Sequence, residues 1–469
     1  MQAKADAGII GLAVMGQNLA LNIESRGFTT AVFNRTAERT REFVGQKCAG
    51  RRVLPAYTLP SFVASLQRPR RIILMVKAGA AVDETLRAIL PRLERGDVVM
   101  DGGNSHFRDT ERRQAEVQAR KLDYLGCGIS GGEYGALHGP SIMPGGERAA
   151  YGKLARVLTA IAARTEDGAC CTYLGAGSAG HFVKMVHNGI EYAMMQTVAE
   201  VFDVMQRGWG LSTPEAQRIF FRWNQGTNKL NGYLVEITAV VLKKTDPETG
   251  RPLVDLIQDR AEQKGTGKWT SQAALDLGVP VPTITAAVDA RIVSGHKADR
   301  VRIARRLGDP ERRGRAASAS DLKRLESGLH AAFLIAYAQG MHLLARASAE
   351  KRYGLNLAEV ARIWKGGCII RSRILTPLKR ALAAKPGHLF ESPLFARLIR
   401  AEVPALRAVV RAANAAAIPV PCLGSALAYY DGFRRARLPA NLIQAQRDHF
   451  GAHTYERTDR EGTFHTQWE

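Results

Sequence analysis

Cysteine is scarce in this sequence, and so are the patterns that would give it a structural task. The chain has six cysteines among 469 residues, and none forms a Cys-x-x-Cys pair. No histidine motif has the spacing of a zinc site either. We therefore expect reduced thiols that are mostly packed in the interior, and no metal.

Long apolar runs are also missing. The longest ones fall well short of the roughly 20 residues that a membrane-spanning helix requires. The N-terminal stretch MQAKADAGIIGLAVMG goes almost directly into a strand pattern, which leaves no room for a signal peptide. These absences predict a cytoplasmic protein with no membrane partner.

Acidic residues are few relative to basic ones: 44 Asp and Glu stand against 66 Lys and Arg, which gives a net charge of +22. Such a balance is typical of proteins that meet nucleic acids, membrane surfaces or anionic metabolites. The densest basic stretch, DRVRIARRLGDPERRGR at 299–315, lacks the interleaved aromatic residues of a groove that binds single strands. We expect a solvated basic surface loop there, and no nucleic-acid partner.

The chain opens with a short apolar strand, Gly8–Ile10, that runs into a glycine turn and a helix. The turn reads Gly11-x-Ala13-x-x-Gly16, the dinucleotide-binding fingerprint with alanine at its second glycine. Small residues let the backbone approach a pyrophosphate, which the helix N-terminus then stabilises. Because a strand precedes the pattern and a helix follows it, the stretch predicts a dinucleotide cofactor.

The second strand, TTAVFNRT, indicates which dinucleotide is bound. An NAD site usually carries an acidic residue about 20 positions after the fingerprint, which binds the ribose 2′-hydroxyl. Here the strand ends in Asn34, Arg35 and Thr36 without an acid. An arginine there suits a 2′-phosphate and favours NADP, the alternative being a solvent-exposed arginine with no ligand.

Three more apolar runs, 70–76, 97–101 and 122–130, each stop at a glycine-rich turn. Ligands of an open parallel sheet bind at the carboxyl ends of its strands, so the turns VKAG, DGGNS and SGGEYGA should face one crevice. Three ordinary glycine turns are the competing interpretation. The strand–helix alternation predicts an α/β, Rossmann-like N-terminal domain over residues 1–177.

Beyond residue 177 the strand pattern disappears and long helical periodicities take over. GLSTPEAQRIF at 210–220 and GLNLAEVARIW at 354–364 are similar, and each follows a helix with a Tyr-Ala pair. We predict an all-helical domain over 178–440 with two related halves, although chance similarity between helices also fits. The aromatic-rich residues 441–469 predict an extended C-terminal tail.

The segment KMVHNGIEY at 184–192 places four polar residues on one face of a predicted helix. Lys184, His187, Asn188 and Glu191 are spaced by three or four residues, and their neighbours are apolar. Lys184 and Glu191 are too far apart for an i,i+4 ion pair but suited to reach around a small polar molecule. A solvated polar stripe is the alternative. The basic loop QKGTGKWT at 263–270 is a candidate phosphate site.

Eleven motifs follow one another along essentially the whole chain: GLAVMG, NRT, LMVKAG, DGGN, SGGEYGA, PSIMPGG, KMVHNGIEY, KGTGKWTSQAALDLG, GCIIRS, LPANLIQAQRDHFGAHTYERTD and FHTQWE. Taken together, they resemble the decarboxylating 6-phosphogluconate dehydrogenase family. The resemblance implies NADP-dependent oxidative decarboxylation of 6-phosphogluconate to ribulose 5-phosphate, with Lys184 as general base and Glu191 as general acid. The sequence departs from the family pattern at Tyr134, Phe333 and His296, and none of these positions is expected to be catalytic.

The same resemblance implies the ligand contacts. The residues expected to bind NADP are Gly11, Leu12, Ala13, Val14, Met15, Gly16, Asn34, Arg35, Thr36, Val76, Lys77, Ala78 and Asn104. Those expected to bind the substrate are Asn104, Ser130, Gly131, Gly132, His187, Asn188, Tyr192, Lys264, Thr266, Arg291, Arg447 and His453. The last two would come from the tail of the partner subunit, so the resemblance also implies a homodimer.

Two other functions stay open at this point. A related β-hydroxyacid dehydrogenase acting on an unphosphorylated acid would keep the nucleotide fold and the lysine, but it would need neither KGTGKWT nor the arginine and histidine of the tail. A basic nucleic-acid-binding protein on a retired dehydrogenase scaffold would bind RNA in a salt-sensitive way without turnover.

Overall fold

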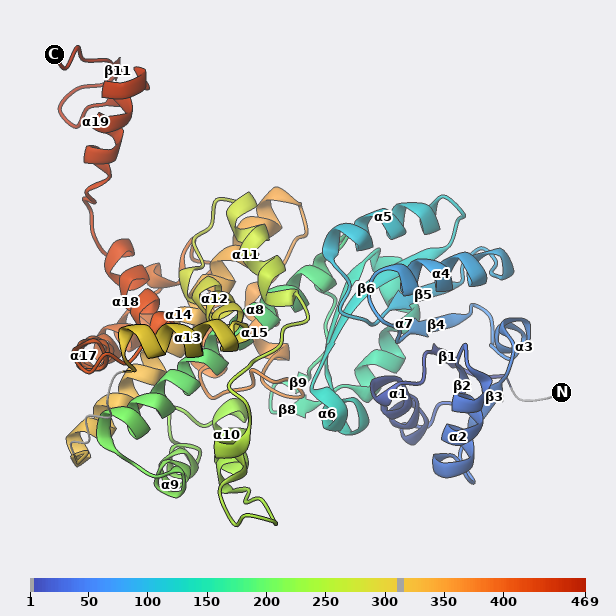
Figure 1. The fold of residues 1–469 in the computed structure, drawn as a ribbon. Coiled ribbons are helices and arrows are strands. Elements are labelled where there is room, and N and C mark those ends of the chain that lie inside the picture. Colours follow the sequence, from blue (N-terminus) through green and yellow to red (C-terminus); the bar gives the residue numbers. More distant parts are fainter. Residues whose placement is uncertain (1–3, 310–315) are drawn as a thin grey trace.

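The computed structural model describes residues 4–309 and 316–469 and has two bodies and a projecting tail (Figure 1). The N-terminal body contains the large sheet, and the second body is helical. This arrangement confirms the predicted fold class, an α/β Rossmann-like domain followed by a mostly helical one. Within the described residues, no helix is long and apolar enough to cross a membrane.

The sheet has seven strands in the order β3-β2-β1-β4-β5-β6-β7. Its strands are β1 (Ala7–Ile10), β2 (Thr30–Phe33), β3 (Val53–Ala56), β4 (Arg71–Leu74), β5 (Val98–Asp101), β6 (Asp123–Ser130) and β7 (Ser141–Gly146). The first six are parallel, and β7 runs antiparallel to β6 at the edge. The turns after β4, β5 and β6 therefore lie along one edge of the sheet, as predicted.

Helices cover both faces of this sheet, which explains why its strands are apolar runs without alternation. Ile9 and Ile73 pack with α1, α2 and α7 on one face, while Ile10 and Ile72 pack with α3, α4 and α5 on the other. The helical and short segments of this body are α1 (Val14–Ser25), α2 (Ala37–Lys47), α3 (Leu59–Ala64), α4 (Ala80–Ile89), η1 (Leu90–Arg92), α5 (Phe107–Gln118), α6 (Gly132–His138), α7 (Arg148–Ile161), β8 (Arg164–Thr165) and β9 (Gly168–Ala169).

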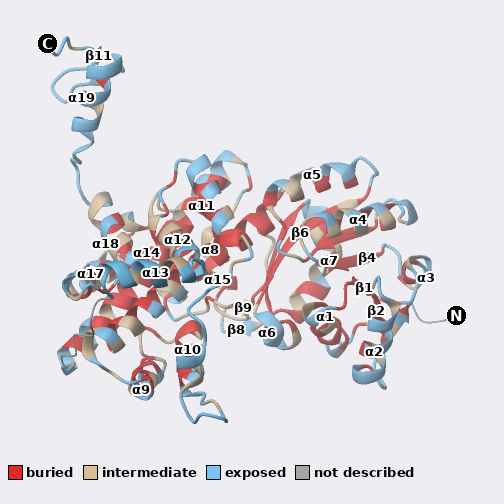
Figure 2. Cartoon of the chain, viewed as in Figure 1, coloured by how far each residue is buried: buried red, intermediate tan, exposed pale blue. Residues whose placement is uncertain are grey.

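Two long helices, α8 (Ala179–Asp203) and α14 (Ala319–Glu350), form the centre of the helical body. Most of their residues are buried, as Figure 2 shows in red, and most of the buried side chains are apolar. Gly340 of α14 lets the helices approach closely, since a Cβ there would lie 2.4 Å from the Ile190 side chain. The N-terminal half of α8 also packs on β6 and β7 and so joins the two bodies.

Shorter helices surround this pair. They are η2 (Val204–Gly208), α9 (Thr213–Trp223), α10 (Tyr233–Lys243), η3 (Leu253–Leu256), α11 (Thr266–Asp276), α12 (Pro282–Gly295), α13 (Lys297–Leu307), α15 (Leu357–Ile363), α16 (Leu375–Leu382), η4 (Leu389–Glu391), α17 (Pro393–Ala415) and α18 (Pro421–Phe433). The two similar sequence segments form α9 and α15, each after a long helix. The boundaries at residues 177 and 440 and the relation between the two halves stay predictions.

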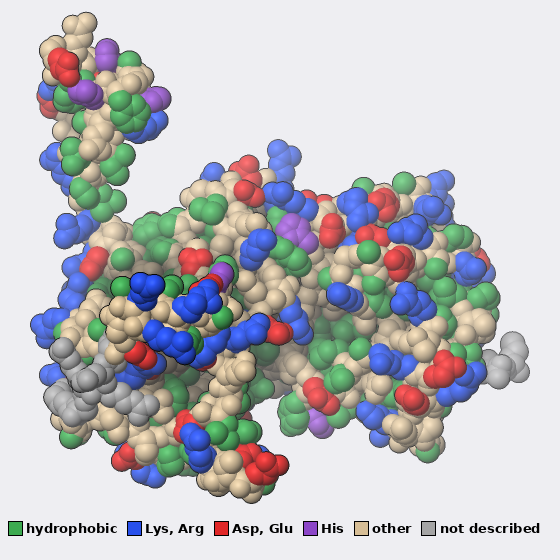
Figure 3. Space-filling model, in the orientation of Figure 1, with side chains coloured by type: hydrophobic (Ala, Val, Ile, Leu, Met, Phe, Trp, Pro, Cys, Tyr) green, Lys and Arg blue, Asp and Glu red, His purple; other side chains and the backbone are tan. Residues whose placement is uncertain are grey.

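The basic segment is a helix where the sequence predicted a loop. Residues 297–307 form α13, which has Asp299 in its first turn and Arg305 and Arg306 in its last. That charge order suits the helix dipole and favours a helix. Arg302, Arg305 and Arg306 are exposed, as expected, whereas Arg300 is half-buried and pairs with Asp259 at 2.9 Å. Figure 3 shows a basic patch over α13. The part of the prediction that covers 310–315 lies outside the described residues.

The tail is an ordered unit that extends away from the helical body (Figure 1). It consists of α19 (Ala440–Gly451) and a small antiparallel hairpin of β10 (Tyr455–Glu456) and β11 (Thr463–Phe464). The buried carboxylate of Asp448 holds it together by accepting hydrogen bonds from the Thr454 and Thr466 backbones and from the Trp468 indole. The hairpin was not predicted.

Candidate active site

A cleft of about 400 Å³ opens at the carboxyl edge of the sheet, where β1, β2 and β4 end. Its lining includes the predicted cofactor residues Gly11, Ala13, Asn34, Arg35, Thr36, Val76 and Lys77. The Asn34 side chain fastens the β2 end to the glycine turn, because its Oδ1 accepts a hydrogen bond from the Leu12 N–H at 3.0 Å. The cleft has the place expected of a dinucleotide site in a parallel sheet.

Two glycines of the fingerprint are required by close packing. Gly11 has φ of +102°, and a Cβ there would lie 2.4 Å from the Met75 carbonyl oxygen. A Cβ at Gly16 would lie 1.9 Å from the Gly11 oxygen, so α1 reaches the turn only without a side chain at that position. Ala13 is exposed at the helix N-terminus, which leaves space for a pyrophosphate above it. The backbone therefore fits a dinucleotide.

Cations gather at the β2 end of this cleft. The Arg35 side chain is 91 % exposed and lies 3.6 Å from the Glu84 carboxylate. Arg39, from the first turns of α2, also lines the cleft. Sequence reasoning missed Arg39, although its position one helical turn beyond Arg35 was a usable signal. No acidic residue follows β2 directly, so this end suits a 2′-phosphate.

Three of the four residues on the polar face of α8, Lys184, His187 and Asn188, are buried rather than solvated, and Glu191 is partly exposed. Only 5 % of Lys184 is exposed, and His187 is fully buried. Gly128 of β6 makes room for the lysine stem, since a Cβ there would lie 2.3 Å from the Lys184 Cβ. The alternative of a solvated polar stripe is therefore wrong.

Burial sets the protonation of this face. It lowers the pKa of Lys184, against the opposing effect of Glu191. It raises the pKa of Glu191, although the Lys184 and Arg291 charges lower it. Burial, and then the Lys184 charge, holds the pKa of His187 well below its usual range, so this imidazole is neutral at pH 7. One helix face thus carries a group able to take a proton and a group able to give one.

Four of the predicted substrate residues form a continuous hydrogen-bond chain. Ser130 Oγ lies 3.3 Å from His187 Nε2, and His187 Nδ1 lies 3.0 Å from Asn188 Oδ1. The Asn188 amide donates to Thr266 Oγ1 at 3.3 Å. All three contacts are satisfied when Ser130 donates to the imidazole and the imidazole donates to the amide oxygen. The chain ties the end of β6 to α8 and to the start of α11.

The predicted phosphate residues also lie together, with two exceptions. The Arg291 guanidinium lies over the Tyr192 ring, with 3.5 Å from Cζ to the ring centroid. Gly267, next to Thr266, packs so closely on the same ring that a Cβ would be 2.5 Å from it. Lys264 is exposed on the loop before α11. The exceptions are Arg447 and His453, both exposed on the projecting tail.

The remaining predicted residues stand at the strand ends. Asn104 is exposed in the turn after β5, and Gly131 and Gly132 follow β6 with positive φ angles. Gly131 packs against the backbone of Gly367, where a Cβ would lie 2.6 Å from the carbonyl oxygen. Two departures from the family pattern lie outside this arrangement. Phe333 is buried in the helical core, and Tyr134 is exposed and packs against His138.

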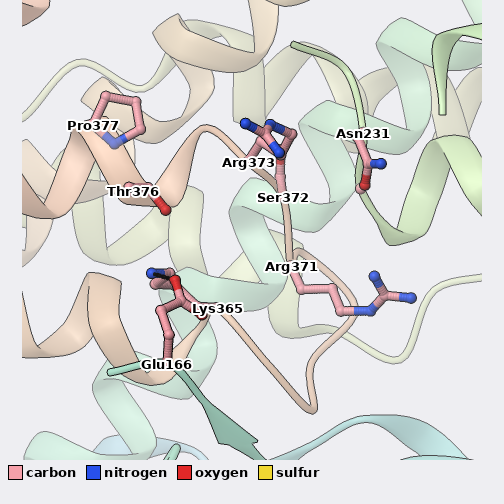
Figure 4. Close-up of a pocket in the computed structure, with 9 residues that line it drawn as sticks. Glu166, Asn231, Lys365, Arg371, Ser372, Arg373, Thr376 and Pro377 are labelled. Carbon is pink, nitrogen blue, oxygen red and sulfur yellow. Dashed lines mark hydrogen bonds and ion pairs between the residues drawn. The ribbon is translucent and has the colours of Figure 1, made fainter. Parts of the chain in front are cut away.

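A second cleft, of about 480 Å³, lies beside the segment 365–377 (Figure 4). Lys365 pairs there with Glu166 and with Asp167 at 2.7 Å, and Arg371 pairs with Glu236. These paired charges join the turn between β8 and β9, and the helix α10, to the segment 365–377. Lys184 and Glu191 do not line this cleft, so we assign it no part in the chemistry.

Comparison with known proteins assigns the family. Residues 6–175 match the NAD binding domain of 6-phosphogluconate dehydrogenase, and residues 180–468 match the C-terminal domain of 6-phosphogluconate dehydrogenase. The chain belongs to the 6-phosphogluconate dehydrogenase family.

Relatives within this family match over nearly their whole length. The chain is 51 % identical to the decarboxylating 6-phosphogluconate dehydrogenase of Synechococcus elongatus, with 98 % of each chain covered. It is 49 % identical to the NADP(+)-dependent, decarboxylating enzyme of Bacillus subtilis, with 99 % of each covered. The structure of the Plasmodium falciparum 6-phosphogluconate dehydrogenase, studied with NADP+ and with 6-phosphogluconate, superposes with a TM-score of 0.95 at 43 % identity and covers 99 % of this chain and 100 % of that one.

Proposed function

We propose that this protein oxidises 6-phosphogluconate with NADP and releases carbon dioxide and ribulose 5-phosphate. The observation that carries the proposal is the buried face of α8, where Lys184 and Glu191 have pKa values shifted towards each other. The full-length similarity to enzymes named for this reaction supports it.

NADP is the cofactor that the cleft favours. Its pyrophosphate would lie against the turn Gly11–Gly16 and the N-terminus of α1, and its 2′-phosphate beside Arg35, Thr36 and Arg39. The residues Val76 to Ala78, after β4, and Asn104, after β5, would hold the other half of the molecule. When bound, NADP supplies the acceptor for the hydride that leaves C3 of the substrate.

Lys184 is the base in this proposal. The substrate is a 3-hydroxy acid, and oxidation at C3 requires removal of the hydroxyl proton. A neutral amine does this when desolvation brings its pKa towards neutrality, as burial does for Lys184. The lysine is then an ammonium beside the new ketone.

Decarboxylation uses that ammonium, so no metal is needed. A β-keto acid loses carbon dioxide when a cation polarises the ketone, and the protonated Lys184 is placed to do so. The resulting enediol must be protonated by a separate acid at the former C2 of the substrate, which becomes C1 of ribulose 5-phosphate. Glu191 fills this role because burial raises its pKa and favours the protonated form.

The substrate would lie between the end of β6 and the start of α11. Asn104, Ser130, Gly131, Gly132, His187 and Asn188 would contact its carboxylate and hydroxyls. Thr266 accepts from Asn188 and keeps its own proton to donate to a phosphate oxygen. With Tyr192, Lys264 and Arg291 nearby, this end favours a phosphorylated acid over the unphosphorylated substrate of a related β-hydroxyacid dehydrogenase.

We infer a homodimer in which the tail of each subunit completes the site of the other. Arg447 and His453 stand on a tail that leaves its own body (Figure 1), and the tail exposes Leu442, Ile443 and Phe450. Exposed apolar side chains on an ordered, projecting element favour docking on a second copy. Both ligands are charged metabolites, and all six cysteines are free thiols, so we infer that the protein works in the cytoplasm.

Lys184→Ala tests the base assignment. We expect turnover to fall by a factor of roughly 10² to 10⁴, the usual contribution of a general base. NADP affinity, measured by titration of protein fluorescence, should stay within about twofold because the lysine lies on the substrate side. Retained turnover would refute the assignment, whereas lost NADP binding would indicate a folding defect.

A further inference from the structure

A buried arginine outside the proposed catalytic set joins two turns of the cofactor edge. Arg113 lies on α5, a helix whose sequence, FRDTERRQAEVQ, is mostly polar. Its neighbour Arg112 is solvated, but the Arg113 side chain is fully buried. A guanidinium is removed from water only at considerable cost, so its partners are informative.

The first partners belong to the turn after β4. Arg113 donates from Nε to Asp83 Oδ1 at 2.8 Å and from Nη2 to Asp83 Oδ2 at 3.1 Å, which is a bidentate pair. Nη2 also donates to the Gly79 carbonyl oxygen at 3.0 Å. The hydrogen bonds to Arg113 hold the pKa of Asp83 at about 2. Arg113 therefore fixes Gly79 and the first turn of α4.

The second set of Arg113 partners belongs to the turn after β5. Arg113 Nη1 donates to Ser105 Oγ at 3.2 Å and lies 3.5 Å from Asp101 Oδ2. Ser105 donates to the same Asp101 oxygen at 2.6 Å, and the other Asp101 oxygen accepts from the Gly103 N–H at 3.0 Å. All of these groups lie within the segment 101–105, which carries Asn104.

We propose that Arg113 is a positioning residue that sets the spacing between the turns 76–79 and 101–105, and so the placement of the reactive end of NADP. The inference rests on the proposed binding of NADP at this edge. The order of the strands in the sheet supports this orientation of NADP. The proposed 2′-phosphate site lies at β2, so the other half of the cofactor would extend over β4 and β5 towards Lys184. Reactions of this kind lose about 10² in rate for a displacement of about 1 Å.

The molecule contains its own control at the opposite edge of the same two strands. Arg70, just before β4, pairs with Asp97, just before β5, at 2.7 Å. The two side chains are 9 % and 2 % exposed, so this ion pair is buried too. It ties the same strands but lies away from the cofactor cleft.

The experiment compares Arg113→Lys with Arg70→Lys. Lysine keeps the charge but cannot make the bidentate pair and reach the second turn at once. For Arg113→Lys we expect the KM for NADP to rise about tenfold, the KM for 6-phosphogluconate to stay within about threefold, and the kinetic isotope effect with substrate deuterated at C3 to increase because hydride transfer becomes slower. Arg70→Lys should lower the Tm and leave all three kinetic quantities within about twofold.

Two outcomes would overturn the proposal: unchanged NADP kinetics in a folded Arg113→Lys protein, or equal kinetic changes in both variants. If Arg113→Lys does not fold, Ser105→Ala tests the same proposal. This variant removes only the bridging hydroxyl and leaves no charge unpaired. An unchanged KM for NADP and isotope effect in Ser105→Ala would then count against the proposal. If the wild-type protein itself does not oxidise 6-phosphogluconate, the proposed function fails separately, and NADP affinity measured by titration tests Arg113 alone.

Discussion

The proposed base and acid are single residues that work only in the protonation states that water disfavours. A solvated lysine is charged at pH 7, and a solvated glutamate is ionised. On α8 burial favours the neutral form of both Lys184 and Glu191. The same burial makes each residue costly to the fold, which is why a functional role explains them better than a structural one.

The pH dependence of kcat/KM should therefore have two limbs, and each limb should report the ionisation of a different residue. Activity rises with pH as Lys184 loses its proton, and because its pKa is lowered this limb lies below the usual lysine range. Activity falls with rising pH as Glu191 ionises, and because its pKa is raised this loss, the alkaline limb, lies above the usual glutamate range. Glu191→Gln should lower kcat by roughly 10² and abolish the alkaline limb, as a pH series of initial rates will record. An alkaline limb that survives in Glu191→Gln belongs to another group.

Among the elements, the contact between α8 and β6 is the one that places the base. Gly128 is the position where the strand touches the Lys184 stem. Because the two bodies meet along this contact, a side chain there must displace α8 from the sheet. The base and the cofactor edge would then move apart.

Gly128→Ala should accordingly lose activity and stability together. We expect a cost of about 1–3 kcal/mol in the free energy of unfolding, typical of overpacking, and a fall in kcat of at least about tenfold. Urea denaturation and steady-state rates measure both. Gly152→Ala is the matched control, because nothing lies within 4 Å of a Cβ at that exposed position in α7. It should be neutral or stabilising by up to about 1 kcal/mol.

In our proposal the turn after β2 is the element that selects the cofactor. Arg35→Ala should raise the KM for NADP by about tenfold or more and leave the KM for NAD nearly unchanged, because only NADP carries the phosphate that the arginine would contact. Arg41→Ala, in the helix α2 that follows this turn, is the control, because Arg41 pairs with Glu38 and does not line the cleft. Equal effects on both cofactors would show that Arg35 does not read the 2′-phosphate.

The elements that could be predicted from the sequence are those whose local residue pattern is typical of the secondary structure that they adopt in the fold. Four of the six parallel strands, β1, β4, β5 and β6, were visible as apolar runs ending in glycine turns, and β2 as a run ending in polar residues. The edge strand β3 was not predicted. β7 was missed because Pro144 and two glycines are atypical of a strand, and they are tolerated at the sheet edge. α13 was missed because its run of arginines was interpreted as a solvated loop. Arg113 was missed because a charged residue on a polar helix gives no local sign of burial, which only the packing of α4 and β5 creates.

At the scale of the whole molecule, the tail raises the question of where Arg447 and His453 act. Both are exposed on an element that extends away from the body of its own chain (Figure 1). Their predicted place beside the phosphate of a partner subunit can be tested without a structure of the dimer. The test uses the fact that a shared site can be repaired by mixing subunits.

Co-expression of Lys184→Ala and Arg447→Ala subunits with different affinity tags gives a purified heterodimer. If the site is shared, one of its two sites combines an intact Lys184 with the partner subunit's Arg447. We expect each single variant to have below about 1 % of wild-type activity and the heterodimer to have about half. A heterodimer as inactive as its parents would show that both residues act within one chain.

The central claim is that one buried helix face both oxidises and decarboxylates a phosphorylated sugar acid. The most direct measurement mixes the purified protein with 6-phosphogluconate and either NADP or NAD, and follows reduced nicotinamide and carbon dioxide together. We expect equal amounts of both products and a preference for NADP. Reduced nicotinamide without carbon dioxide, or no turnover by the folded protein, would contradict it.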